Sequence, residues 1–108
     1  MEATRRWAPD GIYANVLNPG AIATNLQQHT GGLKTPPERR KTSSQGAATT
    51  LLLATSPLLA GIGGRYFEDS NEAEVVVYRP VDYRGVAAYA LDAANAERLL
   101  DVALPLIA

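Results

Sequence analysis

Apolar residues recur along the chain at two spacings, one typical of a strand and one typical of a helix, and together they predict a small α/β unit. Residues 12–17 (IYANVL) are mostly apolar on both faces at a period of two, as in a parallel strand covered on both sides. Gly11 precedes this segment and the turn-forming sequence Asn18-Pro19-Gly20 follows it. Apolar and small residues then recur at helical spacing over 43–55, which predicts a helix with a core-facing stripe. The stripe consists of Ala47, Ala48, Leu51, Leu52 and Thr55.

The order of the remaining elements completes this unit. Thr42 and Gln45 have capping-box spacing at the start of the helix over 43–55, and Ser56-Pro57 ends it. Residues 64–67 include a short strand, and 1–8 are typical of a helix end. Asp92 begins a C-terminal helix over 92–107. Its expected apolar face is Ala96, Leu99, Leu100, Ala103 and Ile107.

This order of helix end, strand, loop, helix, strand and helix predicts two parallel strands joined by a crossover helix. A length of 108 residues allows one small domain. A two-stranded parallel sheet exposes both of its edges and is not a complete α/β domain. We therefore expect either a homo-oligomer or a missing N-terminal half that completes the sheet.

Composition narrows the class of protein. Ten basic residues balance eleven acidic ones, which argues against a nucleic-acid-binding surface. The absence of cysteine excludes disulfides and thiolate metal sites, and a single histidine excludes histidine-cluster metal sites. Residues 42–64 are uncharged, but Pro57 and three glycines favour a buried helix and a turn over a membrane span. The N-terminus lacks the apolar core of a signal peptide, so we expect a cytoplasmic protein.

Residues 11–26 (GIYANVLNPGAIATNL) resemble the segment around the sixth strand of the short-chain dehydrogenase/reductases. The resemblance continues through SSQGAATTLLLATSP, GGRYFED and DAANAERLLDVALPLIA, which are similar to the family's late helix, last strand and C-terminal helix. The most similar branch is retinol-dehydrogenase-like and WW-domain-oxidoreductase-like. The resemblance implies the C-terminal fragment of a Rossmann-type doubly wound parallel sheet. It also implies an NAD- or NADP-dependent oxidoreductase that exchanges a hydride with an alcohol or carbonyl substrate.

The same resemblance assigns cofactor contacts within the segment 12–24. Pro19 and Gly20 match the turn beside the nicotinamide ring. Ile22 matches the position whose backbone meets the carboxamide, and Thr24 matches a hydroxyl that helps to hold the cofactor. A backbone donor and acceptor at the carboxyl end of a strand suit a carboxamide.

Residues 25–41 match the family's substrate loop. Two glycines and two prolines leave it little regular hydrogen bonding, so we expect a mobile lid that carries substrate specificity. Leu26 and Leu33 offer apolar contacts. His29 is either a base or an ordinary surface histidine. The basic residues 39–41 either bind a phosphate or form a solvated surface cluster, and the solvated cluster is the favoured interpretation.

Two parts of such an enzyme are absent from the sequence. None of the five tyrosines is followed by a lysine four residues later, so the family's catalytic pair is missing. The glycines at 61, 63 and 64 precede a strand rather than a helix and do not form a dinucleotide fingerprint. The family carries both parts upstream of this segment, which implies a truncated chain without activity of its own. The alternatives are a non-catalytic dimerisation or interaction module derived from that fold, and a small-molecule binding protein.

Overall fold

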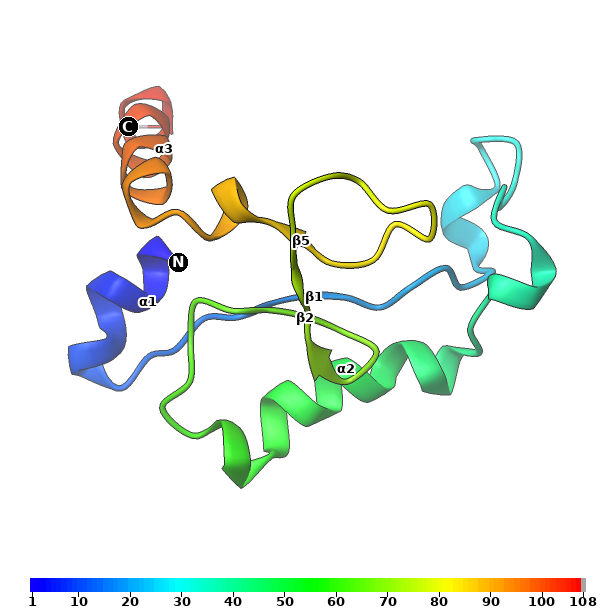
Figure 1. Ribbon diagram of the computed structural model, residues 1–108, viewed down its shortest axis with the longest axis horizontal. Helices are drawn as coiled ribbons and strands as arrows, with labels where there is room; N and C mark the ends of the chain where they lie inside the picture. Colours follow the sequence, from blue (N-terminus) through cyan, green and yellow to red (C-terminus); the bar gives the residue numbers. More distant parts are fainter. Residues whose placement is uncertain (108) are drawn as a thin grey trace.

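The computed structural model describes residues 1–107, and its five short strands form a three-stranded mixed sheet and a separate pair (Figure 1). The strands are β1 (Val16–Asn18), β2 (Tyr66–Glu68), β3 (Asn71–Glu72), β4 (Val75–Val76) and β5 (Val86–Ala87). β1 and β2 pair in parallel, and β3 adds an antiparallel third strand at the other edge of β2. β4 and β5 form a separate parallel pair. The α/β class is confirmed, but these short sheets fall well short of a full doubly wound sheet.

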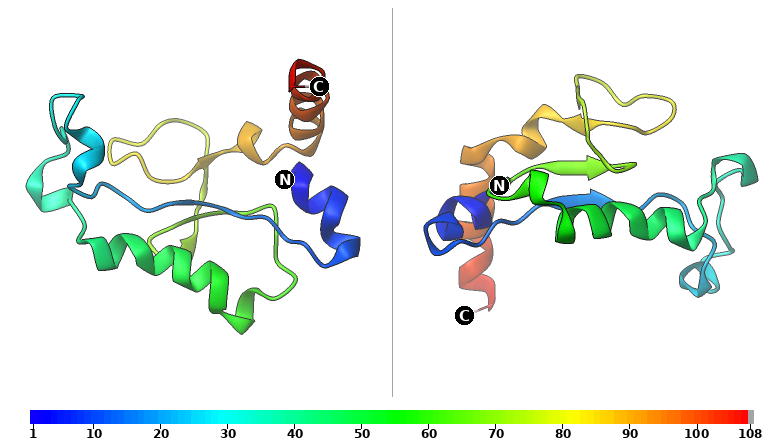
Figure 2. Two further views of the ribbon diagram at one scale, coloured as in Figure 1. Left: turned by 180° about the vertical axis from the view of Figure 1, so that it is seen from behind. Right: turned by 90° about the horizontal axis from the view of Figure 1, so that it is seen from below.

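Helices occupy one side of the sheet and one end of the molecule. The α-helices are α1 (Glu2–Trp7), α2 (Ser43–Thr55) and α3 (Ala93–Ile107). Single-turn 3₁₀ helices are η1 (Ala8–Asp10), η2 (Asn25–Gln27), η3 (Pro37–Arg39), η4 (Pro57–Leu59) and η5 (Ala88–Leu91). In all views α2 runs along β1 and β2, α1 and α3 lie together at one end, and residues 25–41 project at the other (Figures 1 and 2). The crossover β1–α2–β2 therefore places that loop at the carboxyl end of β1.

α2 begins where the capping pattern predicts, but it packs through a different face. Both halves of the capping box form, with Gln45 N–H donating to Thr42 Oγ1 at 3.2 Å and Thr42 N–H to Gln45 Oε1 at 2.9 Å. The buried residues of α2 are Gly46 and Thr49. The expected stripe is wrong at Ala47, Ala48, Leu51 and Thr55, which are all exposed. A small residue is needed on the buried face because Ile22 lies directly against Gly46.

β1 is shorter than the predicted strand over residues 12–17. Strand pairing begins only at Val16. Before that point Gly64 N–H donates to Ala14 C=O at 2.7 Å, and side chains supply further hydrogen bonds. Thr4 Oγ1 bonds both Ala14 N–H (2.9 Å) and Ala14 C=O (3.0 Å). The Asn15 side-chain amide bridges Ile62 C=O (2.8 Å) and Arg65 N–H (3.0 Å). Hydrogen bonds to side chains thus replace part of the expected ladder, which periodicity does not reveal.

The acidic segment after β2 forms a tight hairpin. Asp69 and Ser70 both have positive φ, at 51° and 61°, as a two-residue type I′ turn requires. Ser70 N–H donates to Thr49 Oγ1 at 3.0 Å, and Thr49 is only 1% exposed. This hydrogen bond ties the hairpin to the buried face of α2.

α1 and α3 are held together by charge. Arg5 pairs with Glu97 at 2.9 Å, and Arg6 pairs with Asp101 at 3.2 Å. Both arginines also bond Glu2, and their hydrogen bonds lower the pKa of that buried carboxyl from 4.5 to about 2.

The expected apolar face of α3 is only partly covered. Asp92 caps the helix by accepting from Asn95 N–H at 2.8 Å. Ala96, Leu100 and Ala103 are half-buried, but Leu99 and Ile107 are exposed, contrary to expectation. α3 meets the rest of the described chain mainly at α1 and η5, and these two elements leave most of its surface uncovered.

The hydrophobic core of the described residues is small. Phe67 and Val86 are the fully buried apolar side chains, at 3% and 6% exposure. The accessible surface is 8076 Å², whereas a compact monomer of this mass exposes about 5,800 Å². The radius of gyration, 16.1 Å, likewise exceeds the value of about 13 Å for a compact domain. Within the described residues, no helix combines the length and apolar character needed to cross a bilayer.

Candidate functional site

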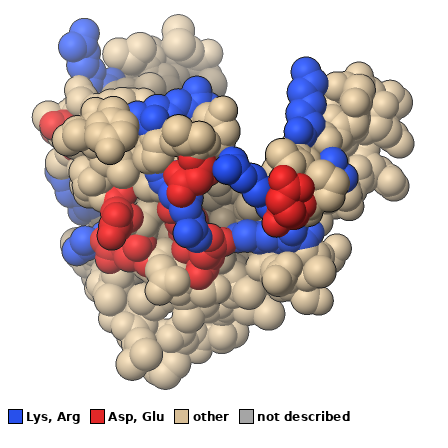
Figure 3. All heavy atoms as spheres, turned by 45° about the vertical axis from the view of Figure 1, so that its right-hand side comes forward, with Lys and Arg blue, Asp and Glu red and all other residues tan. Residues whose placement is uncertain are grey.

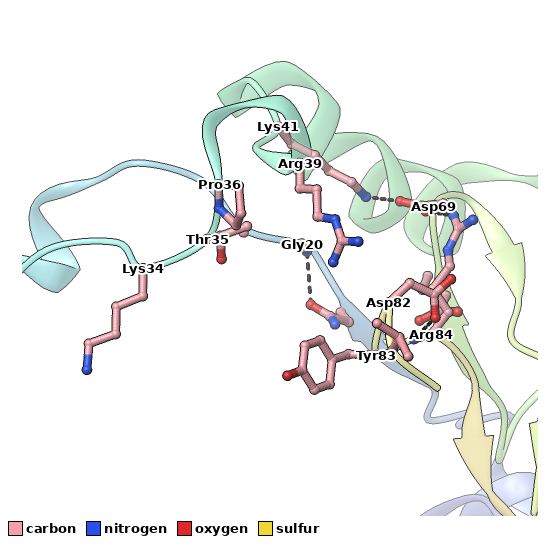
Figure 4. Close-up of a pocket in the computed structure, with 14 residues that line it drawn as sticks. Gly20, Lys34, Thr35, Pro36, Arg39, Lys41, Asp69, Asp82, Tyr83 and Arg84 are labelled. Atoms are coloured by element: carbon pink, nitrogen blue, oxygen red, sulfur yellow. Dashed lines mark hydrogen bonds and ion pairs between the residues drawn. The ribbon is translucent and has the colours of Figure 1, made fainter. Parts of the chain in front are cut away.

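An open cleft of about 960 Å³ lies at the carboxyl ends of β1 and β2 (Figure 4). Open α/β sheets bind ligands at this end of their strands because the loops there form a crevice. Four segments line the cleft: the β1 turn, the loop 25–41, residues 68–69 at the end of β2, and the segment 81–84. Its residues are Asn18, Gly20, Ala21, Lys34, Thr35, Pro36, Arg39, Lys41, Glu68, Asp69, Val81, Asp82, Tyr83 and Arg84.

The turn after β1 is shaped by its own side chain and by a glycine. Asn18 Oδ1 accepts from Gly20 N–H at 2.9 Å, which closes the turn locally. Gly20 has φ +85°, and a Cβ there would lie 2.7 Å from Lys41 Cδ. The positive φ therefore favours glycine at this position, and an added Cβ would also have to displace the end of the Lys41 side chain.

One carboxylate joins the end of the loop 25–41 to the segment 81–84. Asp69 follows β2 and forms ion pairs with both Lys41 and Arg84. Its neighbour Glu68 accepts from Gly85 N–H at 2.8 Å. Lys41 N–H also donates to Ala21 C=O at 2.8 Å, which fixes the end of the loop against the β1 turn. Acidic and basic side chains accordingly gather around the hollow between the projecting loop and the body of the molecule (Figure 3).

The four residues predicted to contact a cofactor have different environments. Gly20 lines the cleft, whereas Pro19, Ile22 and Thr24 do not. The Ile22 side chain packs on Gly46 of α2, so only its backbone is available to the turn. Thr24 Oγ1 accepts from Leu26 N–H at 3.3 Å and caps η2. Their roles as cofactor contacts stay predictions.

The three residues predicted in the substrate loop lie outside the cleft. Leu26 is 82% exposed, and His29 Nε2 is 2.9 Å from Gln28 Nε2 on the outer surface. Leu33 is half-buried, and its carbonyl accepts from Arg40 Nη2 at 3.0 Å. The loop instead presents its later part to the cleft, through Lys34, Thr35, Pro36, Arg39 and Lys41. The predicted substrate roles of Leu26, His29 and Leu33 also stay predictions.

Sequence reasoning missed the contribution of the segment 81–84. The hydrophobic pattern gives this segment no functional signal, yet Tyr83 and Arg84 line the cleft. Tyr83 has φ 61°, unusual for a tyrosine, and its ring lies 4.5 Å from the Arg79 guanidinium carbon. The available signals were the charges at 38–41 and 68–69, of which Lys41 and Asp69 form an ion pair.

The cleft has features that suit one end of a nicotinamide cofactor. A tight backbone turn opens into it beside Gly20, and basic side chains at its rim suit anionic groups. Neither a Tyr-x-x-x-Lys pair nor a glycine-rich helix start occurs in the sequence to supply acid–base chemistry or a diphosphate cradle. In the described residues no cluster of three or more histidine or acidic side chains is arranged to hold a metal ion.

Comparisons with known proteins identify relatives among oxidoreductases. The chain is 51% identical over 109 residues to a probable oxidoreductase of Streptomyces lividans, covering 88% of this chain and 36% of the relative. It is 33% identical over 90 residues to human retinol dehydrogenase 14, covering 69% and 25%. It is 34% identical over 114 residues to the short-chain dehydrogenase/reductase prx1 of Penicillium roqueforti, covering 98% and 34%. No family model and no solved structure matches the chain.

The chain spans about a third of the length of the curated Streptomyces relatives that it matches. Their names agree with the resemblance carried by the strand, the Pro-Gly turn and the later helices. On this combined evidence, the chain belongs to the short-chain dehydrogenase/reductase family and corresponds to a C-terminal fragment of such a protein.

Proposed function

We propose that this chain supplies the nicotinamide side of an NAD- or NADP-dependent oxidoreductase that acts on an alcohol or carbonyl compound. The observation that carries the proposal is the turn Asn18–Gly20 at the carboxyl end of β1, which opens directly into the cleft. When bound, the cofactor would exchange a hydride with the substrate. Acid–base chemistry and the diphosphate cradle would come from residues outside this sequence, so we expect the chain alone to be inactive.

The residues of this chain would bind and orient rather than react. Gly20 and Ala21 present backbone to the cleft, and Asn18 keeps the turn closed through its hydrogen bond to Gly20. The Asp69 ion pairs hold Lys41 and Arg84 at the rim, so the loop 25–41 and the segment 81–84 stay adjacent to the turn. Such positioning contributes to rate by holding reactants in one geometry.

A non-catalytic dimerisation or interaction module is the second candidate. The observation that favours it is the amount of exposed apolar surface on helices that the described residues leave uncovered. On α2 and α3 this includes Leu51, Leu99, Val102 and Leu106. An interaction module would use these faces and would bind no nicotinamide cofactor.

A chimera tests the proposal. This chain replaces the corresponding segment of the Streptomyces lividans relative, and NAD(P)H-dependent reduction of a carbonyl panel is measured. Gly20→Ala should raise the KM for cofactor because a Cβ at φ +85° collides with Lys41. Gly11→Ala is the matched control, since Gly11 has φ +79° and nothing within 4 Å of the added Cβ. Equal effects of both substitutions, or an active parent and an inactive wild-type chimera, would contradict the proposal.

A further inference from the structure

The three consecutive basic residues at 39–41 have three different roles in the structure. Arg40 donates to Thr35 C=O at 2.7 Å and to Leu33 C=O at 3.0 Å, so it holds the loop in shape. Lys41 pairs with Asp69. Arg39 lines the cleft, yet within the described residues its side chain forms no ion pair and no hydrogen bond. One cation of the three is therefore available to a ligand.

The carboxylates around the cleft are already engaged. Asp69 carries two ion pairs, Glu68 accepts from Gly85 N–H, and Asp82 accepts from Arg84 N–H at 3.2 Å. Lys34 also lines the cleft without an ion pair among the described residues. The lining therefore holds four basic and three acidic side chains, and Arg39 and Lys34 are the basic ones without an ion pair among the described residues. This small positive excess favours an anionic ligand.

The close-up shows how these groups face the open volume. The Arg39 guanidinium extends into the cleft between Gly20 and Asp69, and the Tyr83 ring lies across from it with its hydroxyl toward the open side (Figure 4). Tyr83 has a left-handed backbone, and the Arg79 guanidinium lies over its ring. A planar guanidinium can bind a carboxylate with two parallel hydrogen bonds, and a tyrosine hydroxyl on the same cleft is a further donor for it.

We propose that the cleft binds a carboxylate group on the alcohol or carbonyl substrate, with Arg39 as its principal contact. This inference rests on the proposed function for the identity of the substrate, but the anion site itself does not. The proposal assigns substrate specificity to Arg39 and Tyr83 in place of Leu26 and Leu33, the apolar loop residues predicted from the sequence. The same oxyanion chemistry also suits a phosphate of the cofactor, so the experiment compares both sources.

The test is a titration of the ¹⁵N-labelled chain at fixed ionic strength, followed by NMR at the amides of Gly20, Ala21 and Tyr83. The probes are benzoate, its uncharged isostere benzamide, inorganic phosphate and nicotinamide mononucleotide. We expect saturable shifts with benzoate and affinity about tenfold lower for benzamide, because the charge-assisted pair is lost. Phosphate binding tighter than benzoate would overturn the carboxylate assignment.

Variants assign the site to Arg39. Arg39→Gln should weaken benzoate binding about tenfold, and Arg39→Lys should weaken it severalfold because the charge remains without the planar fork. Arg98→Gln is the matched control, since Arg98 is exposed on α3 and does not line the cleft. Unchanged benzoate binding by Arg39→Gln would refute the proposal. Benzoate binding without any response to the mononucleotide would keep the anion site and contradict the proposed cofactor role.

Discussion

The contact between Gly46 and Ile22 joins the buried face of α2 to the predicted cofactor turn, and it can be tested by substitution. Alanine at position 46 would gain about 1 kcal/mol of helix propensity. Its Cβ, however, would overlap Ile22 Cδ1 and lie 3.0 Å from Ile22 Cγ1. Overpacking of this kind costs typically about 1–3 kcal/mol. We therefore expect Gly46→Ala to lower the free energy of unfolding by up to about 2 kcal/mol despite the better helix former.

A double-mutant cycle isolates this collision. Ile22→Val removes the overlapping methyl and by itself costs about 0.5–1.5 kcal/mol. In that background Gly46→Ala should be neutral or stabilising, which gives a coupling energy of about 1–2 kcal/mol. Ala48→Gly is the control for propensity because Ala48 is exposed on the same helix, and it should cost about 1 kcal/mol.

The measurement is urea unfolding at one fixed protein concentration, followed by far-ultraviolet circular dichroism and by fluorescence of the single tryptophan. A fixed concentration is needed because association would change the apparent stability. If Gly46→Ala changes the free energy of unfolding equally in both backgrounds, the two side chains are not in contact and the argument fails.

Three further predictions follow from the hydrogen bonds, charges and exposed surface. Thr49→Val should cost about 1–3 kcal/mol by leaving Ser70 N–H unpaired, and unchanged exchange of the Ser70 amide would contradict this. Because the folded-state pKa of Glu2 is lowered to about 2, the stability that Glu2 contributes is present above about pH 4.5 and is lost as pH falls toward 2. Glu2→Gln should remove this pH-dependent part of the stability, measured as the urea midpoint at each pH. The chain should self-associate through its exposed apolar surface, and sedimentation showing a compact, cooperatively melting monomer at low concentration would refute this.

Local chemistry was enough to predict where several elements begin and end. The capping box at Thr42 and the stop at Ser56-Pro57 mark α2 because they satisfy or remove backbone donors within a few residues. Asp92 marks the start of α3 for the same reason. The parallel pairing of β1 with β2 followed from the order of elements, since a crossover helix leaves few other arrangements.

Tertiary structure decided which face of α2 is buried and which groups pair with the segment around β1. Periodicity selected the leucine-containing stripe of α2, but the close approach of Ile22 buries Gly46 and Thr49 instead. The length of β1 depended on whether residues 12–15 met a backbone or side chains.

The cleft depended most on contacts distant in sequence. The turn Asn18–Gly20 was recognisable from the sequence because its geometry is local. Arg39, Arg40 and Lys41 have the same charge and adjacent positions, so their pattern could not separate a ligand contact from a loop brace and an ion pair. Only the placement of Asp69 across the sheet, 28 residues away from Lys41, distinguishes them. An ion pair between distant residues depends on how the whole chain folds, and local sequence does not encode that separation.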